Sequence, residues 1–318
     1  MIVGQNRDRN YDHIALFLAR NGIQQFLDEN SFPPNAEKLG LGLTDKALFD
    51  FIYERVKALR SKAQPYFLST LTVGTHHPYQ FPVTHPDLEA MQKHFDKYAP
   101  ALRYLDLSLE YFFSKMQKED LLKNTMVLIL GDHGRHEGIG GSDAAARGSH
   151  FLVPFYIWID PSLETELPTR AKLVTNIASQ VDIGPTILAM NNLAPKLAPF
   201  LGQDLSCVLN INCLADNLVY VSGAHDDTIG IVNQDFMWLY RFKVKTFFRT
   251  RLDGKNPEND LTFLDSSSEF TNVNSSLYHI KRNMFGLYVT SNVLLEERLI
   301  RSKTKISNER AKMLPENS

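Results

Sequence analysis

The sequence predicts an α/β protein, with a mainly parallel sheet flanked by helices and a small antiparallel sheet near the C-terminus. Before about residue 190, buried apolar segments alternate with amphipathic helical segments, and the connections between the apolar segments are long, as in parallel sheets. From Val219 onward the pattern changes to short strand-like segments separated by turn residues. The 318 residues are enough for one large α/β domain or two ordinary ones.

The composition is that of a folded globular protein, with 43% hydrophobic and 22% charged residues. These values exclude disordered, collagen-like and disulfide-scaffold proteins. The net charge of -2 gives no electrostatic indication of nucleic-acid binding. The longest apolar runs are far shorter than the ~20 residues that span a bilayer, and Met1–Asn6 lacks the pattern of a signal peptide.

In the first 130 residues, the spacing of apolar positions predicts three helices and two strands. Tyr11–Asn21 and Thr44–Arg60 repeat apolar residues every three or four positions, and the second segment opens with a threonine N-cap. Tyr66–Val73 is apolar and partly β-branched, which predicts a buried strand. The apolar stripe of Tyr98–Gln117 predicts a long helix, and Thr125–Leu130 is the second predicted strand.

A glycine-rich stretch then leads to a third predicted strand, Phe151–Ile159, which Pro154 interrupts. A proline there indicates either an edge strand or a position among the first residues of the strand. Val181–Leu188 is predicted to be a loop that leads into a short helix. The C-terminal part is predicted to form four short strands and a final helix, which are Val219–Ser222, Thr228–Val232, Met237–Phe242, Thr246–Arg251 and Asn274–Leu299.

Two of the predicted strands end in residues that suit metal binding or catalysis, and in parallel α/β sheets the chemistry sits at the carboxyl ends of strands. Asp132 and His133 directly follow the second strand. The flanking Gly131 and Gly134 let the backbone bend so that both side chains face one point. A carboxylate and an imidazole suit Zn²⁺ or Mn²⁺. The alternative is an ordinary polar turn with a surface histidine.

His76 is the candidate at the end of the first predicted strand, where it could contact a metal or a phosphate oxygen. Pro78 forces His77 into an extended conformation, so the two rings should point apart and only one should serve the site. His150 follows the glycine-rich stretch and could swing toward the metal, and Arg9 could grip a phosphate. The alternatives are a polar turn, a surface loop and a solvated terminus.

Cys207 and Cys213 are the two cysteines of the chain, six positions apart. They could form one loop disulfide in an oxidising compartment or remain two buried thiols. Their spacing is not that of a zinc or redox motif.

An ordered set of segments resembles the sulfatase-like branch of the alkaline phosphatase superfamily, and within it the lipoteichoic acid synthases and related phosphoglycerol transferases. The resemblance covers roughly residues 1–205. The segments that carry it are Asn21–Asp28 (NGIQQFLD), Phe67–Pro82 with the sequence TVGTHHP, Ala101–Asp106 (ALRYLD), Asn124–Gly134 (NTMVLILGDHG), and Gln180–Leu188 followed by Phe200–Leu205.

The resemblance implies an alkaline-phosphatase-like fold and metal-dependent transfer or hydrolysis of phosphate or sulfate esters, with phosphoglycerol transfer in cell-envelope polymer synthesis as the first interpretation. It implies that Asp132 and His133 bind a divalent metal, Mn or Zn, with Mg or Ca as alternatives. His76 and His150 would lie on the substrate side, and Arg9 completes the predicted substrate-binding set. The alternative functions are a sulfatase- or phosphatase-type hydrolase and a non-catalytic remnant of the fold.

In that family, a strand ending in Glu and a Thr nucleophile at a helix start precede the segment that begins at Met1. Neither is found here, so no catalytic residue is assigned in this chain, and it is expected to be inactive or incomplete as a fragment. We expect residues 1–215 to form a sulfatase-like catalytic domain without its N-terminal strand and nucleophile segment, and residues 216–318 to form an antiparallel sheet and helix subdomain.

The expected partner is a phosphate- or sulfate-ester substrate, with a lipid head group as one option, and not a nucleic acid. The resemblance implies the extracytoplasmic face of the bacterial inner membrane, with the missing N-terminal portion as a membrane anchor.

Overall fold

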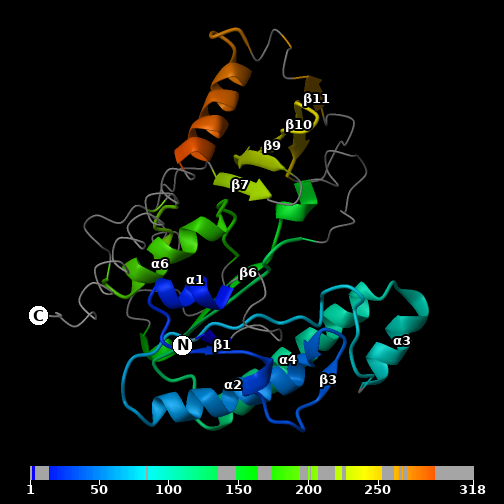
Figure 1. Ribbon diagram of the computed structural model, residues 1–318, viewed down its shortest axis with the longest axis vertical. Coiled ribbons are helices and arrows are strands. Elements are labelled where there is room, and N and C mark those ends of the chain that lie inside the picture. The colour runs from blue at the N-terminus through cyan, green and yellow to red at the C-terminus, as the bar shows by residue number, and fades with distance from the viewer. Residues whose placement is uncertain are drawn as a thin grey trace, which may run out of the picture. The chain divides into compact units, whose positions relative to one another are not determined.

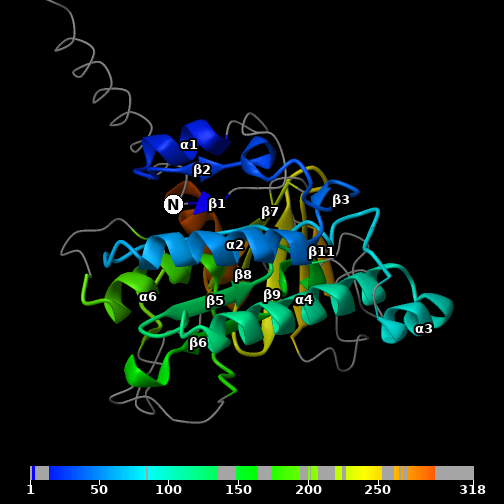
Figure 2. The same ribbon diagram turned by 90° about the horizontal axis from the view of Figure 1, so that it is seen from below.

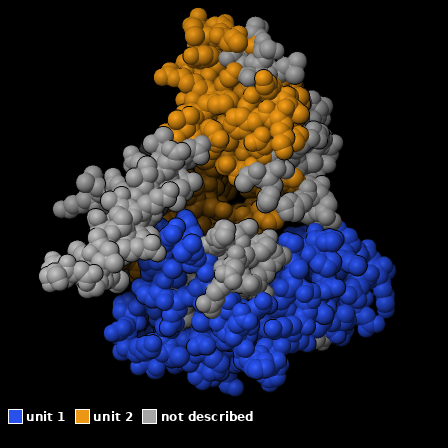
Figure 3. All heavy atoms as spheres, viewed as in Figure 1, with its two compact units in different colours: residues 1–125 blue, residues 126–318 orange. Residues whose placement is uncertain are grey.

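The computed structural model describes residues 2–3, 14–83, 85–134, 148–163, 173–193, 200, 202–206, 219–223, 227–252, 261–264, 267 and 271–290. The chain divides into two compact units, residues 1–125 and residues 126–318 (Figure 3). Arg9, Cys207 and Cys213 lie outside the described residues. The predicted domain boundary near residue 215 stays a prediction.

The first unit combines helices with short strand pairs (Figure 1). Among its described residues, the parallel pair is β1 (Ile2–Val3) with β2 (Phe26–Leu27), and the antiparallel pair is β3 (Lys38–Leu39) with β4 (Gly42–Leu43). The described helical segments are α1 (Ile14–Arg20), the 3₁₀ turn η2 (Glu29–Ser31), α2 (Asp45–Arg60), α3 (Pro86–His94) and α4 (Tyr98–Lys118).

Helices α2 and α4 form the main packing contact of this unit, and both confirm the predicted helices. Thr44 is the N-cap of α2, and its Oγ1 accepts a hydrogen bond from a first-turn N–H at 3.4 Å. The two helices lie side by side (Figures 1 and 2), with Phe49 stacked on Phe112 at a ring-centroid distance of 5.2 Å. Lys115 of α4 also pairs with Asp50 of α2, with 2.7 Å between Nζ and Oδ1.

The predicted strand Tyr66–Val73 is wrong, because the segment is irregular apart from one bridge residue, Ser69. Phe67 is 55% exposed, and the segment joins none of the sheets that the described strands form. An apolar, β-branched run becomes a strand only where a neighbour supplies the ladder hydrogen bonds. Helix α3 was not predicted, although Pro86 occupies its first turn and His85 caps it.

The second unit begins with β5 (Met126–Leu130), as predicted within one residue, and β6 (Phe155–Ile159), which starts directly after Pro154. The two strands run antiparallel, whereas parallel neighbours were expected. The sequence between them is glycine-rich without a helical period, and a parallel neighbour needs a long, usually helical crossover. The described helical segments of this unit before the C-terminal sheet are η3 (Ser149–Phe151), η4 (Pro161–Leu163), η5 (Gln180–Asp182) and α6 (Ile183–Met190).

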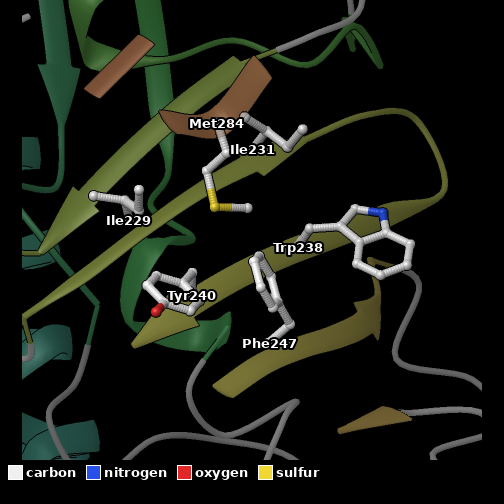
Figure 4. Close-up of a cluster of buried hydrophobic side chains, with 6 residues drawn as sticks. All are labelled: Ile229, Ile231, Trp238, Tyr240, Phe247 and Met284. Carbon is white, nitrogen blue, oxygen red and sulfur yellow. The ribbon is translucent and has the colours of Figure 1, made fainter. Parts of the chain in front are cut away.

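The C-terminal sheet confirms the predicted small antiparallel sheet, and it contains the aromatic core of the second unit. A helix over residues 276–290 covers one face, and its Met284 belongs to the same buried cluster as Ile229, Ile231, Tyr240 and Phe247 of the sheet (Figure 4). Its described strands, in sheet order, are β7 (Val219–Gly223), β8 (Thr228–Val232), β9 (Phe236–Arg241), β10 (Thr246–Arg251) and β11 (Leu261–Leu264), the last of which was not predicted. Within the described residues, no helix has both the length and the apolarity needed to cross a bilayer.

Candidate functional site

The turn directly after β5 is clamped by backbone hydrogen bonds to the segment that leads into β6. The N–H of Gly131 donates to Pro154 O at 3.2 Å, and the N–H of Gly134 donates to His150 O at 2.7 Å. A Cβ at Gly134 would overlap the carbonyl oxygen of Ser149, so a glycine is needed at this position. The backbone from which the two central side chains project is therefore held at both ends of the turn.

Asp132 and His133 project from this turn close to each other. Asp132 Oδ2 lies 3.6 Å from His133 Nε2, and Asp132 Oδ1 accepts a hydrogen bond from the His133 N–H at 2.8 Å. His133 Nδ1 lies 2.8 Å from Gly134 O, so in the neutral ring the proton sits on Nδ1 and Nε2 carries the lone pair. Both side chains are about half-exposed, so solutes can reach them.

This arrangement fits a divalent metal. Two atoms bound to one tetrahedral ion at about 2.1 Å lie about 3.4 Å apart, which is close to the observed separation of Asp132 Oδ2 and His133 Nε2. Metal-binding histidines usually donate their second ring N–H to a carbonyl or carboxylate, as His133 Nδ1 does here. Within the described residues no group of three or more His, Cys, Asp or Glu gathers, so these residues would supply two ligands of a site that needs more.

Gln180 fixes the same turn, and sequence reasoning did not identify it as a site residue. Its Nε2 donates hydrogen bonds to Gly131 O and to Asp132 O, each at 2.8 Å. Gln180 begins η5, where Ser179 and Asp182 form a reciprocal capping box. The Ser179-x-x-Asp182 pattern is a signal for the helix start, but no local pattern indicates which distant carbonyls the glutamine reaches.

His150 lies beside the candidate turn through its backbone. It belongs to η3, and its carbonyl oxygen is the one that Gly134 N–H contacts. The side chain is half-buried. The structure thus brings this segment to the turn, while the role of the His150 ring stays a prediction.

His76 lies in the first unit, in a turn closed by its own backbone. Its N–H donates to Val73 O at 3.0 Å, and its carbonyl oxygen accepts from Tyr79 N–H at 2.8 Å. The ring Nδ1 lies 2.7 Å from His77 O, and the His77 ring packs edge-on against Tyr79. The peptide bond before Pro78 is cis. Because the preceding segment is not a strand, the strand-end argument no longer supports this histidine, and its site role rests on the resemblance.

Solved structures define the class of protein to which this fold belongs. The structure is similar to that of a protein in the alkaline phosphatase superfamily from Vibrio parahaemolyticus, with a TM-score of 0.66 and 21% identity over 92% of this chain and 65% of that one. It is also similar to the lipoteichoic acid synthase LtaP from Listeria monocytogenes, with a TM-score of 0.63 and 16% identity over 95% of this chain and 69% of that one. The predicted α/β, alkaline-phosphatase-like fold is confirmed.

The chain belongs to the sulfatase family, whose model matches residues 4–192. Among curated relatives, the lipoteichoic acid synthase-like YvgJ of Bacillus subtilis is 27% identical over 215 residues, which are 63% of this chain and 33% of the relative. The lipoteichoic acid synthase of Staphylococcus saprophyticus is 27% identical over 248 residues, or 73% of this chain and 33% of the relative. The chain therefore spans about a third of the length of these relatives. The predicted sulfatase-like branch and the likeness to lipoteichoic acid synthases are confirmed.

Proposed function

We propose that this chain carries the metal-binding side of a phosphoester-transfer site, with phosphoglycerol transfer in cell-envelope polymer synthesis as its reaction. The observation that carries the proposal is the pair of Asp132 Oδ2 and His133 Nε2, 3.6 Å apart, with the other ring nitrogen held by Gly134 O. The likeness to lipoteichoic acid synthases supports a phosphoglycerol substrate. Membership of the sulfatase family supports ester chemistry more generally.

In this proposal Asp132 and His133 hold the divalent ion, for which Mn²⁺ and Zn²⁺ are the first candidates and Mg²⁺ and Ca²⁺ the alternatives. When bound, such an ion stabilises negative charge on the phosphoryl oxygens. Gln180 and Gly134 hold the backbone from which both ligands project. No nucleophile is assigned in this chain, so we expect negligible turnover of aryl phosphates by the chain alone.

We propose substrate-binding roles for His76, His150 and Arg9. Cationic N–H groups make strong hydrogen bonds to phosphate oxygens. Because His76 Nδ1 is engaged with His77 O, this ring donates to a phosphate through Nε2 only when it is protonated.

A sulfatase- or phosphatase-type hydrolase is the second candidate, and membership of the sulfatase family supports it. The two candidates differ in the acceptor, which is an alcohol of the growing polymer for the transferase and water for the hydrolase. A non-catalytic remnant of the fold is the third candidate. By likeness to its relatives, we propose the extracytoplasmic membrane face as the location, a lipid head group as one part of the substrate, and residues 1–215 as the catalytic domain.

Calorimetric titration of the purified chain with Mn²⁺ tests the metal role. Asp132→Asn and His133→Ala should each weaken Mn²⁺ binding about 10-fold or more, because each removes one of two ligands. His94→Ala, at an exposed histidine of α3, is the matched control and should bind Mn²⁺ like the wild type. The proposal would be overturned if the wild type failed to bind Mn²⁺, or if the two site variants bound Mn²⁺ with the same affinity as the wild type.

Binding of glycerol 3-phosphate to the Mn²⁺-loaded chain tests the substrate class. We expect tighter binding than for an aryl sulfate, and His76→Ala should reduce the affinity for the phosphate ester. His85→Ala provides the control, because His85 serves as the N-cap of α3 and has no proposed role in substrate binding. Preference for the aryl sulfate would instead favour the sulfatase-type hydrolase.

A further inference from the structure

Asp45 carries a fully buried carboxylate that the proposed chemistry does not use. It occupies the first position of α2 and is 0% exposed. Its Oδ1 accepts a hydrogen bond from the backbone N–H of Gly74 at 3.3 Å, and its Oδ2 has no hydrogen-bond partner among the described residues. A buried carboxylate with so little compensation destabilises a fold, so its presence calls for an explanation.

Gly74 opens the turn that carries His76, and its lack of a side chain matches Asp45. A Cβ at Gly74 would overlap Asp45 Oδ2. From there the turn is closed by the hydrogen bonds of the His76 backbone to Val73 and Tyr79. The Asp45–Gly74 hydrogen bond therefore fastens the beginning of this turn to the start of a long helix, while Tyr79 at its other end packs edge-on against Tyr98 of α4.

The described groups around Asp45 do not neutralise its charge. Lys46, the next residue, pairs instead with Asp50, with 2.9 Å between Nζ and Oδ2. Tyr104 of α4 is also buried, and its pKa is raised by burial and, less strongly, by the Asp45 charge. Burial raises the pKa of Asp45 to about 6, and the hydrogen bond from Gly74 acts in the opposite direction. Above that pH the side chain is mostly ionised.

We propose that Asp45 is a positioning residue, whose buried carboxylate holds the His76-bearing turn in place even though its burial lowers the stability of the fold. A charged acceptor forms a hydrogen bond roughly twice as strong as a neutral one. The ionised side chain therefore fixes Gly74 more firmly than an amide of the same shape would. The functional meaning of this fastening rests on the proposed role of His76, but the fastening itself does not.

Asp45→Asn tests the proposal, because it keeps the size and the Oδ1 acceptor of the side chain and replaces the charged carboxylate by a neutral amide, with NH₂ in the place of Oδ2. At about pH 7.5 the variant should be more stable, with a folding equilibrium constant raised by up to about 100-fold, since the pKa shift from 3.8 to about 6 no longer acts. Hydrogen–deuterium exchange at the Gly74 amide should nevertheless become about 10-fold faster. Amides within α2 should exchange more slowly.

Greater stability together with a looser turn is a result that a merely structural carboxylate would not give. Lower stability of Asp45→Asn, or unchanged exchange at Gly74, would overturn the proposal. Asp50→Asn on the same helix is the matched control, and it should lower stability slightly without changing exchange at Gly74. Neither readout needs metal or substrate, so these results stand even if the proposed function fails.

A double-mutant cycle provides a second measurement. Gly74→Ala should destabilise the wild type more than it destabilises the Asp45→Ala variant, because the overlapping oxygen is then gone. Purely additive effects of the two substitutions would count against a direct fastening of the turn by Asp45.

Discussion

The His76 turn and the Asp132–His133 turn both hold polar side chains in a fixed backbone, but they are fastened in different ways. The first is fastened by Asp45, a buried carboxylate that makes one hydrogen bond at 3.3 Å. The second is fastened by Gln180, an exposed amide that makes two hydrogen bonds at 2.8 Å, and by backbone hydrogen bonds on both sides. Comparing the two turns distinguishes two effects of a fastening group: its effect on the local order of the turn, and its effect on the stability of the whole unit.

The charge and burial of the fastening group decide its effect on stability. A buried, ionised carboxylate lowers stability, whereas an exposed amide that hydrogen-bonds to backbone carbonyls acts mainly on local order. Variants of the two turns should therefore respond differently to side-chain size, to pH and to metal.

The largest expected effect is that of Gly134→Ala. The new Cβ would overlap backbone atoms of Ser149 and His150, which cannot rotate away, so we expect the free energy of unfolding to fall by about 3–4 kcal/mol. Gly74→Ala meets the end of a side chain and should lose about 1–3 kcal/mol. Urea denaturation measures both values. A larger loss for Gly74→Ala than for Gly134→Ala would contradict the expected difference between the two turns.

The second effect is a pH dependence of stability caused by Asp45. Its pKa is raised from 3.8 to about 6 by burial, so in that interval the folded state binds more protons than the unfolded state. The stability that protonated Asp45 contributes is therefore fully present below 3.8 and is lost as the pH rises through about 6, a change of about 3 kcal/mol.

The measurement is the difference between the unfolding free energies of the wild type and Asp45→Asn across this pH interval. The other carboxylates titrate in both proteins and cancel in the difference. Two parallel pH curves would show that burial leaves the titration of Asp45 unchanged.

The third effect concerns the affinity of the other turn for metal. Gln180→Met keeps the length of the side chain but cannot donate to Gly131 O and Asp132 O, and we expect Mn²⁺ binding to weaken by about 10- to 100-fold with little change in global stability. Gln64→Met, at an exposed glutamine, is the control. Equal calorimetric Kd values for both variants would mean that Gln180 does not position the ligands.

The smallest effect is expected for Asp50→Asn, which contrasts a partly buried, ion-paired charge with the fully buried one on the same helix. Burial raises the pKa of Asp50, but hydrogen bonds from Lys115 and Lys46 outweigh it and hold the pKa below its ordinary value. Because the pKa is lowered, the stability that ionised Asp50 contributes is present at neutral pH and is lost as the pH falls. We expect the free energy of unfolding, measured by thermal unfolding at neutral pH, to fall by about 0.5–1 kcal/mol. A gain in stability would contradict the contrast between Asp50 and Asp45.

Much of the fold could be predicted because it is encoded locally. Helices α2 and α4 follow from the spacing of their apolar residues, and the C-terminal strands follow from the turn residues between them. Tyr66–Val73 shows the limit of this reasoning, since an apolar run looks the same whether or not a partner strand is available. The pairing of β5 with β6 was missed for a related reason, because strand direction depends on the connection rather than on the strand.

The candidate site divides in the same way. Asp132 and His133 could be proposed from the sequence because they are adjacent and flanked by glycines, and their site role stays a prediction. Gln180 lies 48 positions from Asp132, and Asp45 lies 29 positions from Gly74, so no local pattern reveals either contact. These fastening residues become visible only when the chain is folded.

The second unit also joins its candidate turn to the C-terminal sheet. Ser179 Oγ donates to Tyr220 O of β7 at 3.1 Å, one residue before Gln180. Phe151, next to His150, packs against the sheet face formed by residues such as Val219 and Leu239. A chain shortened before β7 would leave this phenylalanine in water, and substitutions deep in the sheet would alter a site that their side chains never touch. The sheet therefore supports the backbone of the candidate turn, and substitutions in the sheet should affect the metal binding proposed for that turn.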